Sequence, residues 1–445
     1  MLAFVFPGQG AQFPGMGKAL ADAWPIARAT FEAADAAMEF GLSELCFGGT
    51  AAELARTEFA QPAILATSVA AHRVLVAETG CHPLVVAGHS LGEFTAHVCA
   101  GTLDFATAVR LVRRRGALMQ EAAGPGAGAM LAVLGLDAEV VEQICDAAAH
   151  SEIVAVANYN GAGQVVISGH RGAVARAREL ACERGAIVRE LEVSAPFHCP
   201  LMKPAASGLR AELAAVEFAA PRIPVVDGAS GEWSRTAADP ARSLSAQICA
   251  PVRWDAVMAG LSARGVRYAI EVGPGARLTA MLRRAEKGIR TAHFGEPADL
   301  DGVRELLDDK PWLRRAPGGW RHGERGDLYA PDTAEIVWAG ATEPEPTTGA
   351  AWISRPDGTR LHRYGPMAVL TPDDLLQTFD PAAWTPREDG AYVRADRTAA
   401  IYPDRERERF DPAEWTSDSA GTLRRTDGTR VIWPDGDEWS FTTDR

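Results

Sequence analysis

The chain has 445 residues, 47% of them hydrophobic, which is enough for two or three domains with sizeable cores. Its formal net charge of −13 argues against a nucleic-acid-binding protein and against a peripheral membrane protein. The N-terminus lacks the pattern of a signal peptide, no apolar stretch is long enough to span a bilayer, and the seven scattered cysteines include no CxxC pair. We therefore predict a soluble cytoplasmic protein with reduced thiols and no metal site.

Short β-branched segments alternate with alanine-rich helical segments in the first part of the chain. Strands are predicted over Leu2–Phe6 and Pro83–Ala87, and a helix over Phe105–Ala122 with Asp104 as its N-cap. This alternation predicts an α/β fold, with helices covering the faces of a sheet.

Residues 124–195 have the pattern of an inserted subdomain. Strand, helix, strand, strand, helix and strand are predicted in that order, which is typical of a ferredoxin-like unit. The expected segments are Met130–Leu134, Asp137–Ala149, Ile153–Asn158, Gln164–Ser168, Gly172–Arg184 and Ala186–Leu191. A large domain would then comprise residues 1–123 and 196–308.

The composition changes near residue 310. Residues 311–445 contain no cysteine or lysine but eight of the eleven tryptophans. Phe379–Trp384 recurs as Phe410–Trp415 at an offset of 31 residues, and a looser third copy surrounds Trp352. We predict a β-rich extension of short antiparallel strands with aromatic packing, built from a repeated unit.

The segment Gly88–Gly92 fits the pattern G-x-S-x-G between a predicted strand and a predicted helix over about 93–100. The glycines permit the sharp turn that would expose the Ser90 hydroxyl, and the helix N-terminus would stabilise an oxyanion beside it. The motif and its context favour a serine nucleophile over an ordinary glycine-rich turn. Taken alone, they fit an esterase equally well.

Two other loops are candidates for the same site. Phe6–Gln12 follows the first strand, where an α/β sheet binds ligands, and Gln9 could supply an oxyanion N–H. His198 lies between Pro196 and Pro200 and is a candidate base, although a lone loop histidine is more often structural. His89 and His97 are poor candidate bases because their spacing from Ser90 directs them away from it.

Seven segments, in the same order and spacing, resemble the malonyl-CoA:acyl-carrier-protein transacylases. The resemblance covers about residues 1–308 and excludes the extension. The segments are Phe6–Gln12, Gly88–Glu93, Leu111–Ala122, Asn158–Gly169, Phe197–Pro204, Gln247–Trp254 and Glu271–Gly275.

The resemblance implies an α/β-hydrolase-like large domain with an inserted ferredoxin-like small subdomain. It further implies Ser90 as nucleophile, His198 as general base, Gln247 as the group orienting His198, and the backbone N–H groups of Gln9 and Leu91 as the oxyanion hole. Arg115 is expected to bind the malonyl carboxylate, and Phe197 and Asn160 to contact substrate. The expected reaction is ping-pong transfer of malonyl from malonyl-CoA to an acyl carrier protein or a polyketide synthase carrier domain. The enzyme is expected to need no cofactor, since phosphopantetheine is on the carrier.

Three residues depart from the family pattern, of which Phe94, in place of the usual tyrosine, is a mild change. Phe197 stands where fatty-acid enzymes usually have serine and malonyl-selecting polyketide acyltransferases have phenylalanine, so a polyketide-type enzyme with malonyl over methylmalonyl selectivity is expected. His97 replaces an apolar residue and has no evident role.

Alternatives remain open at this point. One is an editing acyl hydrolase of the same fold, against which Arg115 argues. Others are a transferase for another dicarboxylic extender unit and a scaffold that recruits a synthase through the extension. The extension, residues 311–445, is either a stabilising cap or a docking module for a synthase or carrier protein.

Overall fold

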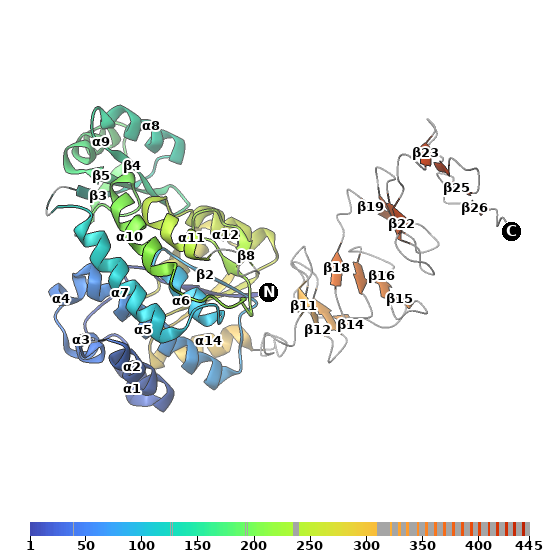
Figure 1. Ribbon diagram of the computed structural model, residues 1–445, viewed down its shortest axis with the longest axis horizontal. Coiled ribbons are helices and arrows are strands. Elements are labelled where there is room, and N and C mark those ends of the chain that lie inside the picture. Colours follow the sequence, from blue (N-terminus) through green and yellow to red (C-terminus); the bar gives the residue numbers. More distant parts are fainter. Residues whose placement is uncertain are drawn as a thin grey trace. The chain divides into compact units, whose positions relative to one another are not determined.

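The fold is seen in a computed structural model, which describes residues 1–308 apart from 39, 125, 127, 192, 194 and 235–239, together with the strand backbones beyond residue 308 (Figure 1). Residue contacts divide the chain into two compact units, Met1–Pro317 and Gly318–Arg445. The first unit contains a six-stranded sheet and a separate four-stranded sheet. The second contains only short strands among the segments that the structure describes.

The six-stranded sheet forms the centre of the first unit and has the order β10-β9-β1-β2-β7-β8. The first five strands in that order run parallel, and β8 pairs antiparallel with β7 at the edge. The strands are β1 (Leu2–Phe6), β2 (Val85–Gly88), β7 (Val225–Val226), β8 (Trp233–Ser234), β9 (Tyr268–Val272) and β10 (Arg290–Phe294).

Strand β1 comes first in the sequence and lies between β2 and β9 in the sheet. All five of its residues are buried, as expected for a parallel strand covered on both faces. The chain extends the sheet from β1 toward β2 and β7, and later returns to the other side of β1 with β9. Ligands bind at such a reversal, outside the carboxyl ends of the strands. The loops after β1 and β2 therefore lie where a site is expected.

Helices cover the two faces of this sheet (Figure 1). Helix α7 begins as predicted, because the Asp104 carboxylate accepts a hydrogen bond from the Thr107 N–H at 2.9 Å. The helices are α1 (Lys18–Ala23), α2 (Pro25–Ala37), α3 (Leu42–Gly48), α4 (Ala51–Ala55), α5 (Thr57–Thr79), α6 (Gly92–Cys99), α7 (Phe105–Glu121), α10 (Lys203–Leu213), α11 (Pro240–Ala246), α12 (Trp254–Ala263), α13 (Arg277–Ala285) and α14 (Leu300–Leu307), with 3-10 helices η1 (Pro200–Met202), η2 (Gln247–Cys249) and η3 (Pro297–Asp299).

Helix α5 is long and apolar enough to cross a membrane by length and composition, contrary to the expectation that no such stretch exists. However, 78% of its apolar window is buried inside the protein. It packs against α2 and α7, so it is a central helix of the fold.

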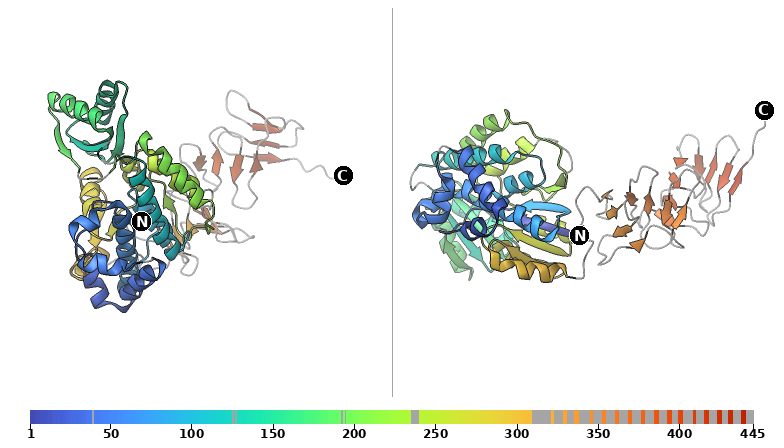
Figure 2. Two further views of the ribbon diagram at one scale, coloured as in Figure 1. Left: turned by 60° about the vertical axis from the view of Figure 1, so that its left-hand side comes forward. Right: turned by 90° about the horizontal axis from the view of Figure 1, so that it is seen from below.

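The four-stranded sheet belongs to the small subdomain and confirms the predicted ferredoxin-like pattern. Its order is β4-β5-β3-β6, all antiparallel, with two helices on one face over their own apolar core. The subdomain projects from the large one beyond the end of α7 (Figures 1 and 2). Its elements are β3 (Gly128–Leu134), α8 (Ala138–Ala149), β4 (Val154–Tyr159), β5 (Gln164–His170), α9 (Arg171–Glu183) and β6 (Ile187–Glu190).

The small subdomain is tied to the large one by backbone hydrogen bonds. Asn158 forms a parallel bridge with Val252, the Tyr159 N–H donates to the Val252 carbonyl at 2.9 Å, and the Val252 N–H donates to the Ala157 carbonyl at 2.9 Å. The loop that follows η2 therefore extends the subdomain's β4. This loop begins just beyond Gln247, so the tie lies close to the predicted site.

The second unit confirms the predicted β-rich extension, with four antiparallel four-stranded sheets, each in sequential strand order. The sheets begin at residues 321, 352, 384 and 415, which agrees with the repeat length found in the sequence. The expected aromatic packing lies outside the described residues. The strands are β11 (Arg321–His322), β12 (Leu328–Ala330), β13 (Glu335–Val337), β14 (Glu345–Pro346), β15 (Trp352–Ser354), β16 (Arg360–His362), β17 (Ala368–Leu370), β18 (Leu376–Thr378), β19 (Trp384–Pro386), β20 (Tyr392–Arg394), β21 (Ala399–Ile401), β22 (Glu408–Arg409), β23 (Trp415–Ser417), β24 (Leu423–Arg425), β25 (Arg430–Ile432) and β26 (Glu438–Ser440).

The cysteines all lie in the described part of the chain and are free thiols, as predicted. Burial raises the pKa of Cys46 to about 12 and raises that of Cys99 further still. Both thiols therefore stay protonated and behave as small apolar side chains.

Candidate active site

The turn between β2 and α6 holds Ser90 in a left-handed backbone conformation, with φ of 53°. Non-glycine residues rarely adopt this conformation, and it is found where a site must expose one side chain. A Cβ atom at Gly88 would lie 1.9 Å from the Gly92 carbonyl carbon, and one at Gly92 would lie 2.1 Å from the Phe6 carbonyl oxygen. Only glycine fits at either position, as the motif predicted.

His198 lies against Ser90 although 108 residues separate them. Its Nε2 atom is 2.7 Å from the Ser90 Oγ, and its Nδ1 atom is 2.9 Å from the Gln247 carbonyl oxygen and 3.2 Å from that of Ala250. Because carbonyl oxygens only accept, the ring proton belongs on Nδ1, and Nε2 keeps a free lone pair directed at the serine hydroxyl. His198 also has a positive φ, 59°, so both members of the pair are held in strained backbone.

The imidazole of His198 is uncharged at neutral pH. Burial lowers its pKa to about 3, with the nearby Arg115 guanidinium as the second cause. A neutral imidazole that faces a hydroxyl can accept the hydroxyl proton. The site therefore has a base that needs no prior deprotonation.

Gln247 was expected to orient His198, and the structure shows that its backbone carbonyl makes that contact. Its side chain makes different ones. The amide Nε2 donates to the Ser90 carbonyl at 3.1 Å and to Glu93 Oε2 at 2.5 Å, and Oε1 accepts from Arg115 at 3.1 Å. A single residue thus contacts both the base and the cation of the site.

Arg115 extends from α7 into the same site and is almost completely buried. Its Nη2 donates to Ser90 Oγ and to Gln247 Oε1, each at 3.1 Å, and Nη1 donates to Gln61 Oε1 at 2.7 Å. Burial lowers its pKa to about 10, so it stays charged at neutral pH. Its Nε–H has no acceptor among the described residues. A planar cation therefore lies within hydrogen-bonding distance of the nucleophile with donor capacity unused.

The two predicted oxyanion donors come from adjacent loops. The loop after β1 packs on the Ser90 turn so closely that a Cβ atom at Gly8 would lie 2.4 Å from the His89 carbonyl oxygen. The Gln9 side chain donates to Thr57 Oγ1 at 3.1 Å. Within residues 1–308 as described, the backbone N–H groups of Gln9 and Leu91 make no hydrogen bond. Both N–H groups therefore stay candidate oxyanion donors, as the resemblance implies.

Asn160 and Phe197 are placed near the site without a contact that defines a role. Asn160 Oδ1 is 3.2 Å from His89 Nε2, and the His89 ring lies edge-on to Trp254. His89 is thus directed at the small subdomain rather than at Ser90 Oγ. Phe197 is buried directly before His198.

Sequence reasoning missed two polar residues of the site. Gln61 on α5 holds Arg115 and also donates to the Met119 sulfur at 3.6 Å. Glu93, within the recognised motif but given no role, is buried and accepts from Gln247. Burial and the neighbouring Asp227 raise the pKa of Glu93 to about 8. The sequence offered one indication for each residue. Gln61 is a polar residue within an otherwise apolar helix, and Glu93 is a charged residue in a helix that is expected to be buried.

The unexplained His97 is also buried on α6, and its Nδ1 has no partner among the described residues. Burial lowers its pKa to about 4, although Asp227 acts in the opposite direction. Above pH 6.5 the residue is neutral in both the folded and the unfolded chain. Below pH 6.5 the unfolded chain binds a proton that the folded chain cannot, so His97 lowers stability until about pH 4.

Replacing His97 with leucine is therefore expected to stabilise the protein in acid. Relative to the wild type, the free energy of unfolding of His97→Leu should rise by about 2 kcal/mol more at pH 5 than at pH 7.5. Urea unfolding at the two pH values measures this difference. Equal effects at both values would contradict the assignment of a neutral buried imidazole.

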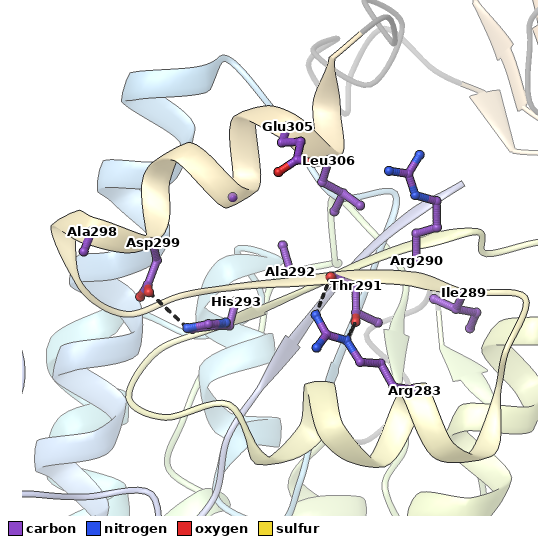
Figure 3. Close-up of a pocket in the computed structure, with 11 residues that line it drawn as sticks. Arg283, Ile289, Arg290, Thr291, Ala292, His293, Ala298, Asp299, Glu305 and Leu306 are labelled. Atoms are coloured by element: carbon purple, nitrogen blue, oxygen red, sulfur yellow. Dashed lines mark hydrogen bonds and ion pairs between the residues drawn. The ribbon is translucent and has the colours of Figure 1, made fainter.

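A cavity of about 540 Å³ lies elsewhere, beside the edge strand β10 between α13 and α14 (Figure 3). Its charged side chains are partly paired with one another or with the strand. Arg283 donates to Thr291 Oγ1 at 2.8 Å, and His293 Nε2 is 3.0 Å from the Asp299 carboxylate. None of its lining residues belongs to the Ser90 cluster, so this cavity is separate from the candidate active site.

Comparison with known proteins agrees with this geometry. Residues 3–301 match the acyl transferase domain family. The malonyl CoA-acyl carrier protein transacylase of Escherichia coli K12 is 44% identical over 306 residues, covering 68% of this chain and 99% of the relative. The corresponding Bacillus subtilis strain 168 protein is 43% identical over 311 residues, covering 69% and 98%.

Solved structures give the same result. The malonyl CoA-acyl carrier protein transacylase of Coxiella burnetii has a TM-score of 0.67 at 39% identity and covers 69% of this chain and 97% of its own. A malonyl-transacylase solved in complex with its type II PKS acyl-carrier protein has a TM-score of 0.67 at 41% identity, covering 68% and 99%.

Proposed function

The chain belongs to the acyl transferase family that includes the malonyl CoA-acyl carrier protein transacylases, and we propose from this premise that it transfers malonyl from malonyl-CoA to the phosphopantetheine thiol of an acyl carrier protein through an ester on Ser90. The activity is that of an acyl-carrier-protein S-malonyltransferase. The observation that supports the ester route is the convergence of His198 Nε2 and Arg115 Nη2 on the Ser90 hydroxyl.

The first half-reaction begins with the hydroxyl proton of Ser90. Oγ attacks the thioester carbonyl carbon while its proton passes to His198 Nε2, and the Gln247 carbonyl stabilises the imidazolium through Nδ1–H. The carbonyl oxygen becomes an oxyanion, for which the N–H groups of Leu91 and Gln9 are the proposed donors. Collapse breaks the carbon–sulfur bond, and the departing CoA sulfur takes the proton back from His198.

The second half-reaction reverses these roles. The carrier thiol attacks the malonyl ester and gives its proton to His198 Nε2. When the ester bond breaks, that proton returns to Ser90 Oγ. Malonyl now forms a thioester on the carrier, and the enzyme is regenerated. No cofactor of the enzyme's own takes part in this scheme.

Arg115 is proposed to bind the free carboxylate of the malonyl group. A carboxylate in a buried site needs a partner that stays charged, and guanidinium offers two parallel donors. When the malonyl group binds, Gln61 and Gln247 can continue to accept hydrogen bonds from the guanidinium. The Nε–H, which has no acceptor among the described residues, is then available to donate to the malonyl carboxylate. The acyl selectivity would then come from charge pairing next to the ester.

The proposal is tested by mass spectrometry of the intact protein after exposure to an equimolar pool of malonyl-, methylmalonyl- and acetyl-CoA. The expected result is an adduct of malonyl mass on the peptide containing Ser90, which disappears when holo carrier protein is added and reappears on the carrier. Rapid release of the acyl group to water without carrier loading would instead support an editing hydrolase.

Replacing Arg115 with alanine is expected to remove malonyl preference. The kcat/KM for malonyl-CoA should fall by about 100-fold or more, because a buried charge-assisted pair is lost, while acetyl-CoA should lose far less. Steady-state transfer assays with both donors measure the ratio.

The matched control is Arg114→Ala. Arg114 is the adjacent residue on α7, but it is exposed and pairs with Glu212 and Glu121 at the surface. It should retain both activities. Continued malonyl selectivity in Arg115→Ala would show that another group recognises the carboxylate.

We further propose that the enzyme acts in the cytoplasm and serves a polyketide pathway. Phe197, buried beside His198, supports a site closed to an α-methyl branch, and one similar structure carries the carrier protein of a type II PKS. Loading rates measured with the carrier proteins of a fatty-acid synthase and of a polyketide synthase would separate the two pathways. Faster loading of the fatty-acid carrier would contradict the pathway assignment.

A further inference from the structure

Glu93 is a buried carboxylate one helical turn beyond Ser90, and none of the proposed catalytic steps uses it. Only 1% of its surface is exposed. Its Oε2 atom accepts hydrogen bonds from Gln247 Nε2 at 2.5 Å and from the Gly228 N–H at 3.1 Å. The carboxyl group therefore connects the beginning of α6 with η2 and with the turn after β7.

The contacts of the Gln247 amide fix which way round it lies. Its Nε2 faces two acceptors, the Ser90 carbonyl and Glu93 Oε2, while its Oε1 faces a donor, Arg115 Nη2. A flipped amide would place Nε2 against the guanidinium and Oε1 against two oxygens. Glu93 Oε2 accepts from both Gln247 Nε2 and the Gly228 N–H, so as an acceptor it favours a single orientation of the amide.

Two charged groups act on Glu93 from either side. Burial and Asp227 raise the pKa of Glu93, whereas Arg115, which is hydrogen-bonded to the other end of the Gln247 amide, acts in the opposite direction. Ser243 Oγ is 3.5 Å from Glu93 Oε1 and also donates to the Asp227 carboxylate. The acidic pair is thus separated by a hydroxyl, and Glu93 is the member that contacts Gln247.

We propose that Glu93 is a positioning residue for malonyl transfer: through the Gln247 amide it holds the Arg115 guanidinium against Ser90 Oγ, and thereby sets both the rate and the malonyl selectivity. This inference rests on the proposed function. Glu93 itself touches neither the nucleophile's hydroxyl nor the base. Its effect passes through one side chain, whose backbone also orients His198.

Two substitutions distinguish the effect of the Gln247–Glu93 hydrogen bond from the effect of filling the same space with a side chain. In Glu93→Gln, the amide oxygen can still accept from Gln247 and Gly228, so kcat for malonyl transfer should stay close to that of the wild type. In Glu93→Leu, no acceptor remains. Its kcat should fall by about 100-fold with a smaller change in KM, and the malonyl-to-acetyl preference should fall with it, because displacement of a positioned group by about 1 Å has effects of that size.

Gly228→Ala provides a second route if Glu93→Leu fails to fold. A Cβ atom there would lie 2.8 Å from Glu93 Oε2, and so would displace the carboxylate without removing it. We expect a partial loss of kcat and of malonyl preference in the same direction as for Glu93→Leu.

The matched control is Glu271→Gln, which alters a buried carboxylate of β9 that accepts from the Thr279 N–H at 2.7 Å and contacts none of Ser90, His198 and Arg115. It should leave kcat and selectivity unchanged. Full activity in folded Glu93→Leu, or equal loss toward malonyl and acetyl donors in every Glu93 and Gly228 variant, would overturn the proposal. Failure of wild-type protein to form a malonyl adduct on Ser90 would instead overturn the proposed function, so the two outcomes are distinguishable.

Discussion

Replacing Ser90 with alanine is expected to lower kcat for malonyl transfer by about 10⁴-fold or more, while malonyl-CoA still binds. Removal of a serine nucleophile that is activated by histidine removes the whole covalent route, and only binding and oxyanion stabilisation remain. Arg115 loses its hydrogen bond to the serine hydroxyl in this variant but keeps those to Gln61 and Gln247. Transfer assays and calorimetric titration with malonyl-CoA measure the two effects separately.

The control for this variant is Ser207→Ala, on the exposed side of α10, which should transfer malonyl at the wild-type rate. A Ser90→Ala protein that still loads carrier at a substantial rate would show that malonyl passes directly between thiols. The same variant must also fail to form the adduct seen by mass spectrometry, since its Cβ carries no oxygen.

Replacing Gly92 with alanine is expected to destabilise the protein by about 4 kcal/mol or more, which places it among the most damaging single substitutions. The added Cβ would lie 2.1 Å from the Phe6 carbonyl oxygen, and that oxygen also accepts the His89 N–H at 3.0 Å. Both atoms belong to backbone at the centre of the sheet, so neither can move away cheaply. Urea unfolding and the yield of folded protein measure the effect.

The comparison for this variant is Gly302→Ala in α14. No heavy atom lies within 4 Å of a Cβ there, and the residue is inside a helix, so alanine should be neutral or stabilise the protein by up to about 1 kcal/mol. A Gly92→Ala protein as stable as Gly302→Ala would show that the turn accommodates the added methyl group, and would contradict the predicted clash with Phe6.

Much of the fold could be predicted because its signals are local. Strand β1, helix α7 with its Asp104 cap, and the six elements of the small subdomain were all expected within a few residues of their observed bounds. Each has its own hydrophobic period, cap or turn. The repeat of the extension was found in the same way, although its first copy, which begins at Arg321, lacks the aspartate-proline motif and was missed.

The candidate site was only partly predictable because two of its polar residues gain meaning from packing. Gln61 resembles any glutamine in a helix until α5 lies beside α7 and brings it to Arg115. The backbone carbonyl of Gln247 orients His198, and the identity of a side chain does not predict such a backbone contact. Burial of His97 was missed because an imidazole on a short helix is usually solvated.

The pairing of β1 has a consequence for how the protein is made. Leu2 and Ala3 lie beside Tyr268 and Ala269 of β9, and the Met1 amino group donates to the Gly265 carbonyl at 3.0 Å. During translation, β1 must therefore wait until synthesis has reached β9 before its second neighbour arrives. The small subdomain, whose contacts are all closer in sequence, can fold meanwhile. Until then an apolar strand edge is open to misassembly, so an early chaperone that shields β1 would favour correct folding over aggregation.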